Sequence, residues 1–244
     1  MQKKLLCSCC GRCLSLQQNL CSRIKTISHF LHTMNFKDQS VAIVDYGIGN
    51  IHSVFQALLE CGAKNVVISS DPDVINQCSH LIVPGVGSFQ AGMLGLEKNH
   101  LIEPIKLFAS SGKPLLGICL GAQMLLSESE EFGLQAGLNL IEGKVIHIPK
   151  CKEFSYRVPL IGWVDMQITC NDPILAGMNA EESFYFVHSL HCMPLAAESQ
   201  LLAYKAGEHN ITALISKDNI YGAQFHPEKS SASGLRFLTN FLSL

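Results

Sequence analysis

The chain has 244 residues, of which 48% are hydrophobic and 16% are charged, and its formal net charge is -2. A chain of this length can bury a large core, and its composition is typical of a globular protein rather than a disordered one. The near-neutral charge excludes a long cationic surface for nucleic acid. No apolar run reaches the roughly 18 residues that a membrane-spanning helix needs. We therefore expect no nucleic-acid partner and no membrane partner.

Residues 1–39 differ in composition from the rest, because they hold a cluster of cysteines and no carboxylate before Asp38. Three interpretations stay open: a metal site on the CxCCxxC cluster, a cleaved targeting segment, and a disordered leader or over-extended start with initiation at Met34. We favour the last, because the cluster lacks the two spaced ligand pairs of a zinc site and its apolar stretches are short. The other cysteines occur singly, which is typical of reduced thiols in the cytoplasm.

From residue 41 onward, short apolar strands alternate with helical patterns. Strands are predicted at residues 41–46, 65–69, 80–85 and 113–121, with helices through Leu59, over 71–77, through Leu107 and over 122–129. Four buried strands that alternate with helices indicate a parallel sheet covered on both faces. Ligands are then expected at the carboxyl ends of the strands.

After Glu131 the pattern changes to strands in succession, and a last helix begins near Ser230. The strands are predicted at residues 139–149, 158–168, 183–189, 200–206, 210–216 and 219–225. They should add mixed or antiparallel strands to the parallel core. The sequence therefore predicts an α/β fold with a central, mostly parallel sheet flanked by helices, in one domain over residues 40–244.

Two glycine-containing turns follow predicted strands, and neither fits a nucleotide site. "GIGN" at 47–50 lacks the third glycine of a dinucleotide fingerprint, and "PGVG" at 84–87 lacks the GK[ST] end of a P-loop. We interpret the first as a tight strand-to-helix crossing. No cofactor and no metal are expected.

Cys119 is the strongest candidate nucleophile, because "GICLG" has the GxCxG spacing of a nucleophile elbow. At such an elbow a strand turns sharply into a helix, and the flanking residues must be small so that neighbouring chain can pass close by. A helix N-terminus also favours the thiolate. The elbow alone does not decide between a nucleophile and a buried structural cysteine.

"FHPEKS" at 225–230 supplies the partners that a thiolate nucleophile needs. His226 can act as base and acid, and Glu228 can hold the imidazole tautomer. In extended chain, residues i and i+2 project to the same side, so we expect the carboxylate to reach the imidazole. The sequence therefore predicts the catalytic triad Cys119, His226 and Glu228.

These motifs resemble those of the class I, triad-type glutamine amidotransferases. Within that class, "VAIVDYGIGN", "LIVPGVGSF", "SEEFGLQAGLNLIEGKV", "VPLIGW" and "FYFVHS" are similar to, and in the order of, the glutaminase subunit of imidazole glycerol phosphate synthase. The resemblance runs from residue 40 almost to the end. It implies hydrolysis of L-glutamine to glutamate and ammonia.

The resemblance also implies roles for further residues. An oxyanion hole would use the backbone N–H groups of Val86 and Leu120. The amino-acid end of the substrate would be held by Gly87, Gln123, Ser189 and Leu190. A partner would contact Asn50, Trp163 and Lys229.

Ammonia is lost as ammonium near neutral pH, so a docked consumer is expected. By resemblance this partner is a (β/α)8-barrel cyclase or synthase subunit in a heterodimer, which makes imidazole glycerol phosphate and an aminoimidazole carboxamide ribotide in histidine biosynthesis. Leu160 and Val164 depart from the residues frequent near that contact. Amidation of a surface-polysaccharide sugar therefore stays open, as does a non-catalytic regulatory subunit, which an intact triad disfavours.

Overall fold

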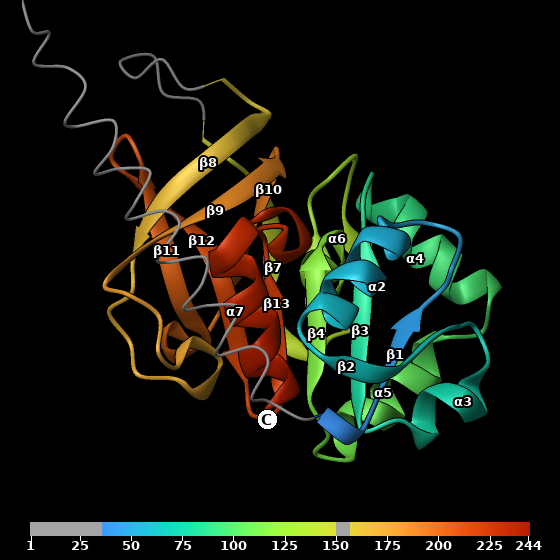
Figure 1. The fold of residues 1–244 in the computed structure, drawn as a ribbon. Coiled ribbons are helices and arrows are strands. Elements are labelled where there is room, and N and C mark those ends of the chain that lie inside the picture. The colour runs from blue at the N-terminus through green and yellow to red at the C-terminus, as the bar shows by residue number, and fades with distance from the viewer. Residues whose placement is uncertain (1–35, 150–156) are drawn as a thin grey trace, which may run out of the picture. The chain divides into compact units, whose positions relative to one another are not determined.

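The computed structural model describes residues 36–149 and 157–244 (Figure 1). The expectations about residues 1–35 lie outside the described residues, and the domain boundary at residue 40 stays a prediction. The first strand begins at Phe36, earlier than the expected position 41. Within the described ranges, no helix has the length and apolar character needed to cross a membrane.

A seven-stranded sheet forms the centre of the fold, in the order β11-β12-β13-β4-β3-β1-β2. Strands β1, β2, β3, β4 and β13 pair in parallel, whereas β11 and β12 are antiparallel to their neighbours. The predicted mixed, mostly parallel sheet is therefore confirmed. The strands are β1 (Phe36–Val44), β2 (Ala63–Ser69), β3 (His80–Gly85), β4 (Leu115–Cys119), β11 (Gln200–Ala206), β12 (His209–Lys217) and β13 (Ile220–Ala223).

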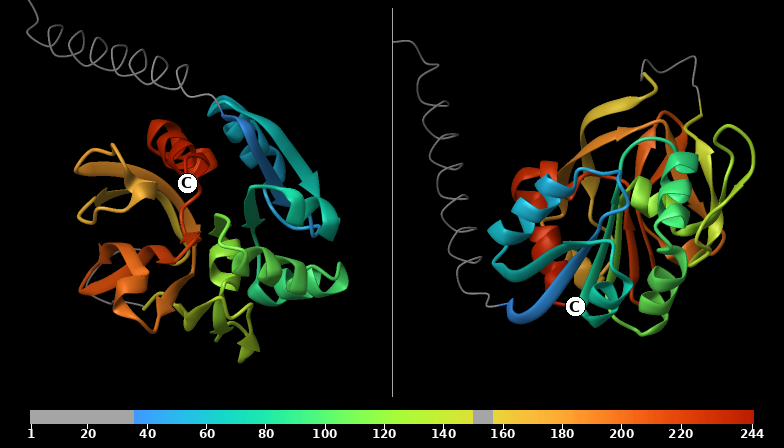
Figure 2. Two further views of the ribbon diagram at one scale, coloured as in Figure 1. Left: turned by 90° about the horizontal axis from the view of Figure 1, so that it is seen from below. Right: turned by 90° about the vertical axis from the view of Figure 1, so that its right-hand side faces the viewer.

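Helices cover both faces of this sheet because its strands are apolar on both sides (Figures 1 and 2). Val41 and Ile43 of β1 pack in one cluster with α2 (Ile51–Glu60) and α7 (Ser231–Leu242). Ala42 and Val44, which alternate with them, pack in a second cluster on the other face. That cluster includes residues of α3 (Pro72–Gln77), α4 (Phe89–Lys98) and α5 (Ile102–Ser110).

The C-terminal strands do not all join the central sheet, which corrects the sequence prediction. A four-stranded sheet has the order β10-β7-β5-β6, and β8 pairs with β9 in a separate two-stranded sheet. Of the C-terminal strands, only β11, β12 and β13 extend the central sheet. The additional strands are β5 (Leu126–Ser129), β6 (Gln135–Ala136), β7 (Ile141–His147), β8 (Leu160–Gln167), β9 (Glu181–His188) and β10 (Leu190–Pro194). Short 3-10 turns occur at η1 (Pro173–Leu175), η2 (Ala197–Ser199) and η3 (Pro227–Lys229).

Three further local predictions need correction. The helix expected over 122–129 ends early, since α6 spans Leu120–Met124 and the next residues pair as β5 with β6 and β7. Tertiary pairing overrides a helix-favouring composition there. The single helix expected through Leu107 is two helices, α4 and α5, with His100 at a φ of +55° between them. Strand β2 is only partly buried, because it lies at the sheet edge.

Candidate active site

The predicted elbow is present at the end of β4. Cys119 has φ +55° and ψ -106°, a conformation that costs energy for a residue with a Cβ, and α6 begins directly after it. A Cβ on Gly121 would lie 1.8 Å from the Val83 carbonyl oxygen, and one on Gly117 would lie 2.7 Å from the Ala122 nitrogen. Only glycine fits at either position, so the close packing of the elbow explains the GxCxG spacing.

The register of the sheet brings the other parts of the site to Cys119. Gly85, at the end of β3, lies directly opposite Cys119, and Ala223, at the end of β13, lies opposite Ile118. These three neighbouring strands run parallel, so their carboxyl ends meet at one edge. The site therefore forms where the parallel topology places ligands.

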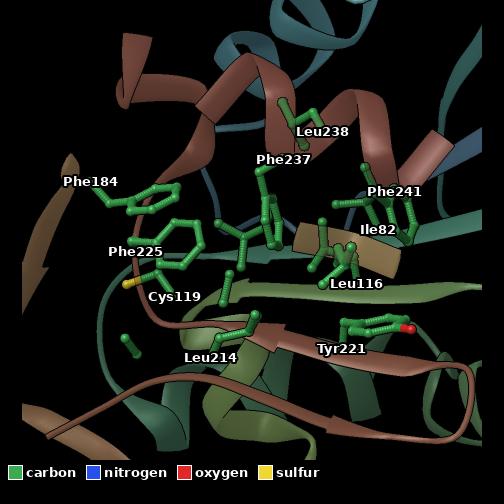
Figure 3. Packing of buried hydrophobic residues seen from close by; sticks show 14 of the residues in the cluster. Ile82, Leu116, Cys119, Phe184, Leu214, Tyr221, Phe225, Phe237, Leu238 and Phe241 are labelled. Atoms are coloured by element: carbon green, nitrogen blue, oxygen red, sulfur yellow. The ribbon is translucent and has the colours of Figure 1, made fainter. Parts of the chain in front are cut away.

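The segment that carries His226 is anchored in the core by Phe225. The Phe225 ring packs between Phe184, with ring centroids 4.2 Å apart, and Phe237, at 5.1 Å. Figure 3 shows Cys119 at the margin of this cluster, on the side of Phe184 and Phe225. The His226 backbone N–H also donates to the Tyr185 carbonyl over 2.9 Å. The imidazole is thus attached to a rigid part of the fold.

His226 and Glu228 pair as expected, but through a different local structure. His226 Nδ1 donates to Glu228 Oε1 over 2.9 Å. The segment is not extended: β13 ends at Ala223, and Pro227–Lys229 forms a 3-10 turn. Proline presets the φ of a first helical position, which explains the turn and corrects the predicted strand geometry.

The surroundings of His226 favour its charged form. Burial alone would lower the pKa of the imidazole, but interactions with Cys119 and Glu228 outweigh this effect and raise the pKa to about 9. His226 is 3% exposed, and the Glu228 side chain is also buried. The arrangement therefore supports an imidazolium between a sulfur and a carboxylate, as a thiolate nucleophile requires.

Asn50 belongs to this group of side chains, although its expected role was only partner contact. Its Nδ2 donates to Glu228 Oε1 over 3.3 Å, and its Oδ1 accepts from Ser53 Oγ over 2.8 Å. The amide is therefore oriented by α2 and supports the carboxylate. The contact joins residues 178 positions apart, so no local sequence signal could reveal it.

A cavity of about 290 Å³ opens beside the sulfur. Most of the predicted site residues line it, namely Val86, Gly87, Cys119, Leu120, Gln123, Ser189, Leu190, His226 and Lys229. Glu228 is not among its lining residues and supports His226 from behind. The cavity has a size suited to a small molecule.

Glu131 lines the same cavity and was missed as a site residue. Its Oε2 accepts from the Phe89 backbone N–H over 2.5 Å, which holds the carboxylate at the start of α4. A carboxylate in a small-molecule cavity can pair with an ammonium group. Glu131 lies in the segment "SEEFG", which resembles the family's sequence, but nothing local distinguishes it from a surface acid.

The predicted oxyanion-hole residues lie on two sides of Cys119. Leu120 begins α6, and Val86 lies in the loop after β3, where Gly87 has a φ of +102°. The loop is fixed at its start, because Tyr46 Oη donates to the Pro84 carbonyl over 2.5 Å. Val86 is 40% exposed, so the loop forms part of the cavity mouth.

The predicted substrate residues Gln123 and Leu190 contact each other at the cavity wall. The Leu190 carbonyl accepts from Gln123 Nε2 over 3.2 Å and contacts His188 Nδ1 at 2.8 Å. Gln123, Ser189 and Leu190 all line the cavity, and the amide of the buried Gln123 side chain is already engaged in protein contacts.

An apolar surface lies beside the cavity on the sheet of β8 and β9. Ile161 and Trp163 are 62% and 53% exposed, and Val187, which lines the cavity, pairs directly opposite Ile161. Leu160 and Val164, the two departures from the family pattern, alternate with Trp163 and pack against the core. They therefore lie on the opposite face of the strand from Trp163.

The described residues contain no group of three or more His, Cys, Asp or Glu side chains arranged to hold a metal ion. The five cysteines in those ranges are all free thiols.

The fold agrees with that of known proteins. The family model "Glutamine amidotransferase class-I" matches residues 42–243, so the chain belongs to that family. Among solved structures, "Crystal structure of glutamine amidotransferase" has a TM-score of 0.64 at 18% identity and covers 84% of this chain and 100% of its own. "Structure of PurLQS from Thermotoga maritima" has a TM-score of 0.63 at 20% identity and covers 84% and 98%. These structural similarities show that the chain has the fold of these proteins.

Curated relatives of this chain belong to a narrower group within the family. The chain is 43% identical over 212 residues to imidazole glycerol phosphate synthase subunit HisH 1 of Legionella pneumophila strain Paris, covering 84% of this chain and 99% of the relative. It is 43% identical over 202 residues to subunit HisH of Sulfurimonas denitrificans, covering 82% and 96%. For subunit HisH of Methanosarcina mazei the identity is 42% over 205 residues, covering 84% and 98%.

Proposed function

We propose that the protein is the glutaminase subunit of an imidazole glycerol phosphate synthase, acting in histidine biosynthesis. The observation that carries this proposal is the buried pairing of His226 with Cys119 and Glu228 at the wall of a small cavity. The relatives' names favour the histidine pathway over amidation of a polysaccharide sugar. The intact triad disfavours a purely regulatory subunit.

The first half of the reaction forms a thioester. The Cys119 thiolate attacks the side-chain carbonyl carbon of glutamine, and the carbonyl electrons move to oxygen. The backbone N–H groups of Leu120 and Val86 would stabilise this oxyanion. His226, as imidazolium, gives its proton to the amide nitrogen, so that the C–N bond breaks and ammonia leaves.

The second half releases glutamate. Neutral His226 takes a proton from water, and the resulting hydroxide adds to the thioester carbonyl. The C–S bond then breaks and its electron pair returns to sulfur, which restores the thiolate and the imidazolium. Glu228 accepts the hydrogen bond from His226 Nδ1 throughout and stabilises the charged imidazole. Glu131 is placed to pair with the α-ammonium group of the substrate.

We infer that a second subunit covers the apolar surface of Ile161, Trp163 and Val187. Exposed aromatic and aliphatic side chains beside a cavity mark interaction sites. Ammonia released into water would be protonated, so a cyclase or synthase barrel docked in a heterodimer would receive it directly. Lys229 at the cavity wall and Asn50 beside Glu228 would lie near such a partner. The single free thiols are compatible with a cytoplasmic site for this reaction.

The test is a glutaminase assay of the wild type and Cys119→Ala, each with the cognate synthase present. We expect glutamate release by the wild type and a loss of at least about 1,000-fold in kcat in the variant, because removing a triad nucleophile abolishes covalent catalysis. Equal rates in the two proteins would overturn the proposal.

A further inference from the structure

A buried side-chain amide, that of Gln224, contacts Cys119 and has none of the roles assigned so far. Gln224 follows β13 directly, and its Nε2 donates to Cys119 Sγ over 3.7 Å. The position follows from the sheet register, because Ala223 lies opposite Ile118 and the next residues on both strands are Gln224 and Cys119. The Gln224 backbone N–H donates to the Ala213 carbonyl over 2.9 Å, which fixes the chain at this point.

The orientation of the Gln224 amide is determined by its neighbours. Gln123 Nε2 donates to the Leu190 carbonyl over 3.2 Å and to Gln224 Oε1 over 3.0 Å. A backbone carbonyl can only accept, so the NH₂ group of Gln123 must face Leu190. Gln224 must then present its oxygen to Gln123. Its own NH₂ group is left facing the sulfur.

The other end of this network is held by a neutral histidine. His188 Nδ1 donates to the same Leu190 carbonyl over 2.8 Å, and its Nε2 accepts from Tyr204 Oη over 2.9 Å. Burial lowers the pKa of His188 to about 4, so it carries one proton near neutral pH and keeps this tautomer. Each hydrogen bond in the network from Tyr204 to the Cys119 sulfur therefore has only one possible donor and one possible acceptor.

Burial makes any other orientation of the Gln224 amide energetically costly. Gln224 is 1% exposed and Gln123 is 5% exposed. A buried amide that turned around would place two oxygens, or two NH₂ groups, against each other, and unpaired buried polar groups are costly. The amide N–H is therefore held toward the sulfur before any substrate binds.

We propose that Gln224 is a further catalytic residue, whose carboxamide donates a hydrogen bond to the Cys119 sulfur and stabilises its thiolate form. The inference rests on Cys119 being the nucleophile of the proposed glutaminase. A neutral thiol or thioester sulfur is a weak acceptor, whereas an anion accepts strongly. The bond therefore strengthens at two moments: before attack on glutamine, and when the C–S bond of the thioester breaks and its electron pair returns to sulfur.

The test measures how the reactivity of Cys119 depends on pH. Wild type and Gln224→Met, a substitution of similar volume without a donor, are treated with iodoacetamide across about pH 3.5 to 10. This window spans the ionisation of both imidazolium-paired and ordinary thiols. Alkylation of the Cys119 peptide is followed by mass spectrometry. We expect the midpoint of the profile to move up by about one pH unit in the variant, since a hydrogen bond to a charged group is of that size.

Controls separate this effect from a general loss of packing. Thr212→Val removes a buried hydroxyl that pairs with Gln200 over 2.8 Å and does not contact the sulfur, so its midpoint should equal that of the wild type. Gln224→Leu also removes the donor and adds no charge, and it should move the midpoint by about as much as Gln224→Met. This second variant serves if the first does not fold.

An unchanged midpoint in a folded Gln224 variant would overturn the proposal and leave the residue a packing role only. An equal shift in Thr212→Val would also overturn it. Alkylation needs no glutamine turnover, so a protein that lacks glutaminase activity but shows the shift would contradict the proposed function and not this inference.

Discussion

Two buried histidines line the cavity and differ in charge at neutral pH, since His188 is neutral and His226 is positively charged. Burial lowers the pKa of His188 to about 4, and the hydrogen bond from its Nδ1 to the Leu190 carbonyl offsets only part of this effect. Burial acts on His226 in the same direction, but Glu228 and the Cys119 sulfur raise its pKa to about 9. The two environments fit the proposed role of His226 in proton transfer and a positioning role for His188.

The raised pKa of His226 predicts that the free energy of unfolding depends on pH. The pKa of His226 is raised above its unfolded value of about 6.5, so its contribution is fully present below that pH and is lost as pH rises through 9. We expect the free energy of unfolding to fall between pH 6.5 and 9 by about 3 kcal/mol at most from this group. Urea unfolding across this range measures it.

Glu228→Gln removes the charge that supports the imidazolium and should flatten this pH dependence. It should also lower kcat, because the imidazole loses the partner that fixes its tautomer. His226→Gln has no titrating group at this position and is the control. A slope in His226→Gln equal to that of the wild type would assign the pH dependence to other groups.

At the scale of elements, the catalytic turn depends on how closely α7 packs against it. A Cβ on Gly234 would lie 1.9 Å from the Pro227 carbonyl oxygen. Ser230 Oγ donates to the His226 carbonyl over 2.7 Å and accepts from the Tyr185 N–H over 2.9 Å. The turn that presents His226 is thus held between a helix and a strand, and it has little room to move.

Gly234→Ala should therefore destabilise the protein by about 3 kcal/mol and lower kcat, because the backbone of the turn must shift. Gly92→Ala is the matched control in α4, since its Cβ would meet only side chains, chiefly the flexible end of Met124 at 2.6 Å. We expect that change to stay within about 1 kcal/mol. Thermal unfolding and glutaminase rates measure both, and equal effects of the two substitutions would contradict this account.

The sequence predicted those elements whose signal is local. The elbow was predictable because two glycines flank Cys119, and the pairing of His226 with Glu228 because they are two residues apart. β5 was missed, since its residues favour a helix until β7 pairs with them. Asn50 and Gln224 were also missed as contacts of the triad, because those contacts depend on the register between distant segments.

At the scale of the whole molecule, the apolar surface beside the cavity is the feature that a partner would use. Trp163 is half exposed on β8, and its ring packs edge-on against Tyr185 with centroids 5.9 Å apart. A rigid, exposed aromatic side chain is typical of the residues that dominate binding energy in interfaces.

Trp163→Ala should weaken binding of the synthase subunit by about 2 kcal/mol, or roughly 30-fold in Kd, while it leaves the stability of the free chain nearly unchanged. Leu107→Ala is the control, because Leu107 is 63% exposed on α5, which is not part of the β8 and β9 sheet. Isothermal titration of both variants measures the effect. Equal affinities for the two would place the partner elsewhere.

The central claim is covalent catalysis by Cys119, and rapid acid quenching followed by peptide mass spectrometry tests it most directly. Wild-type protein mixed with glutamine and the synthase subunit should carry an adduct on the Cys119 peptide with the mass of glutamine less ammonia. The adduct should be absent from Cys119→Ala. Steady turnover of glutamine without such an adduct, or with the adduct on another cysteine, would contradict the account.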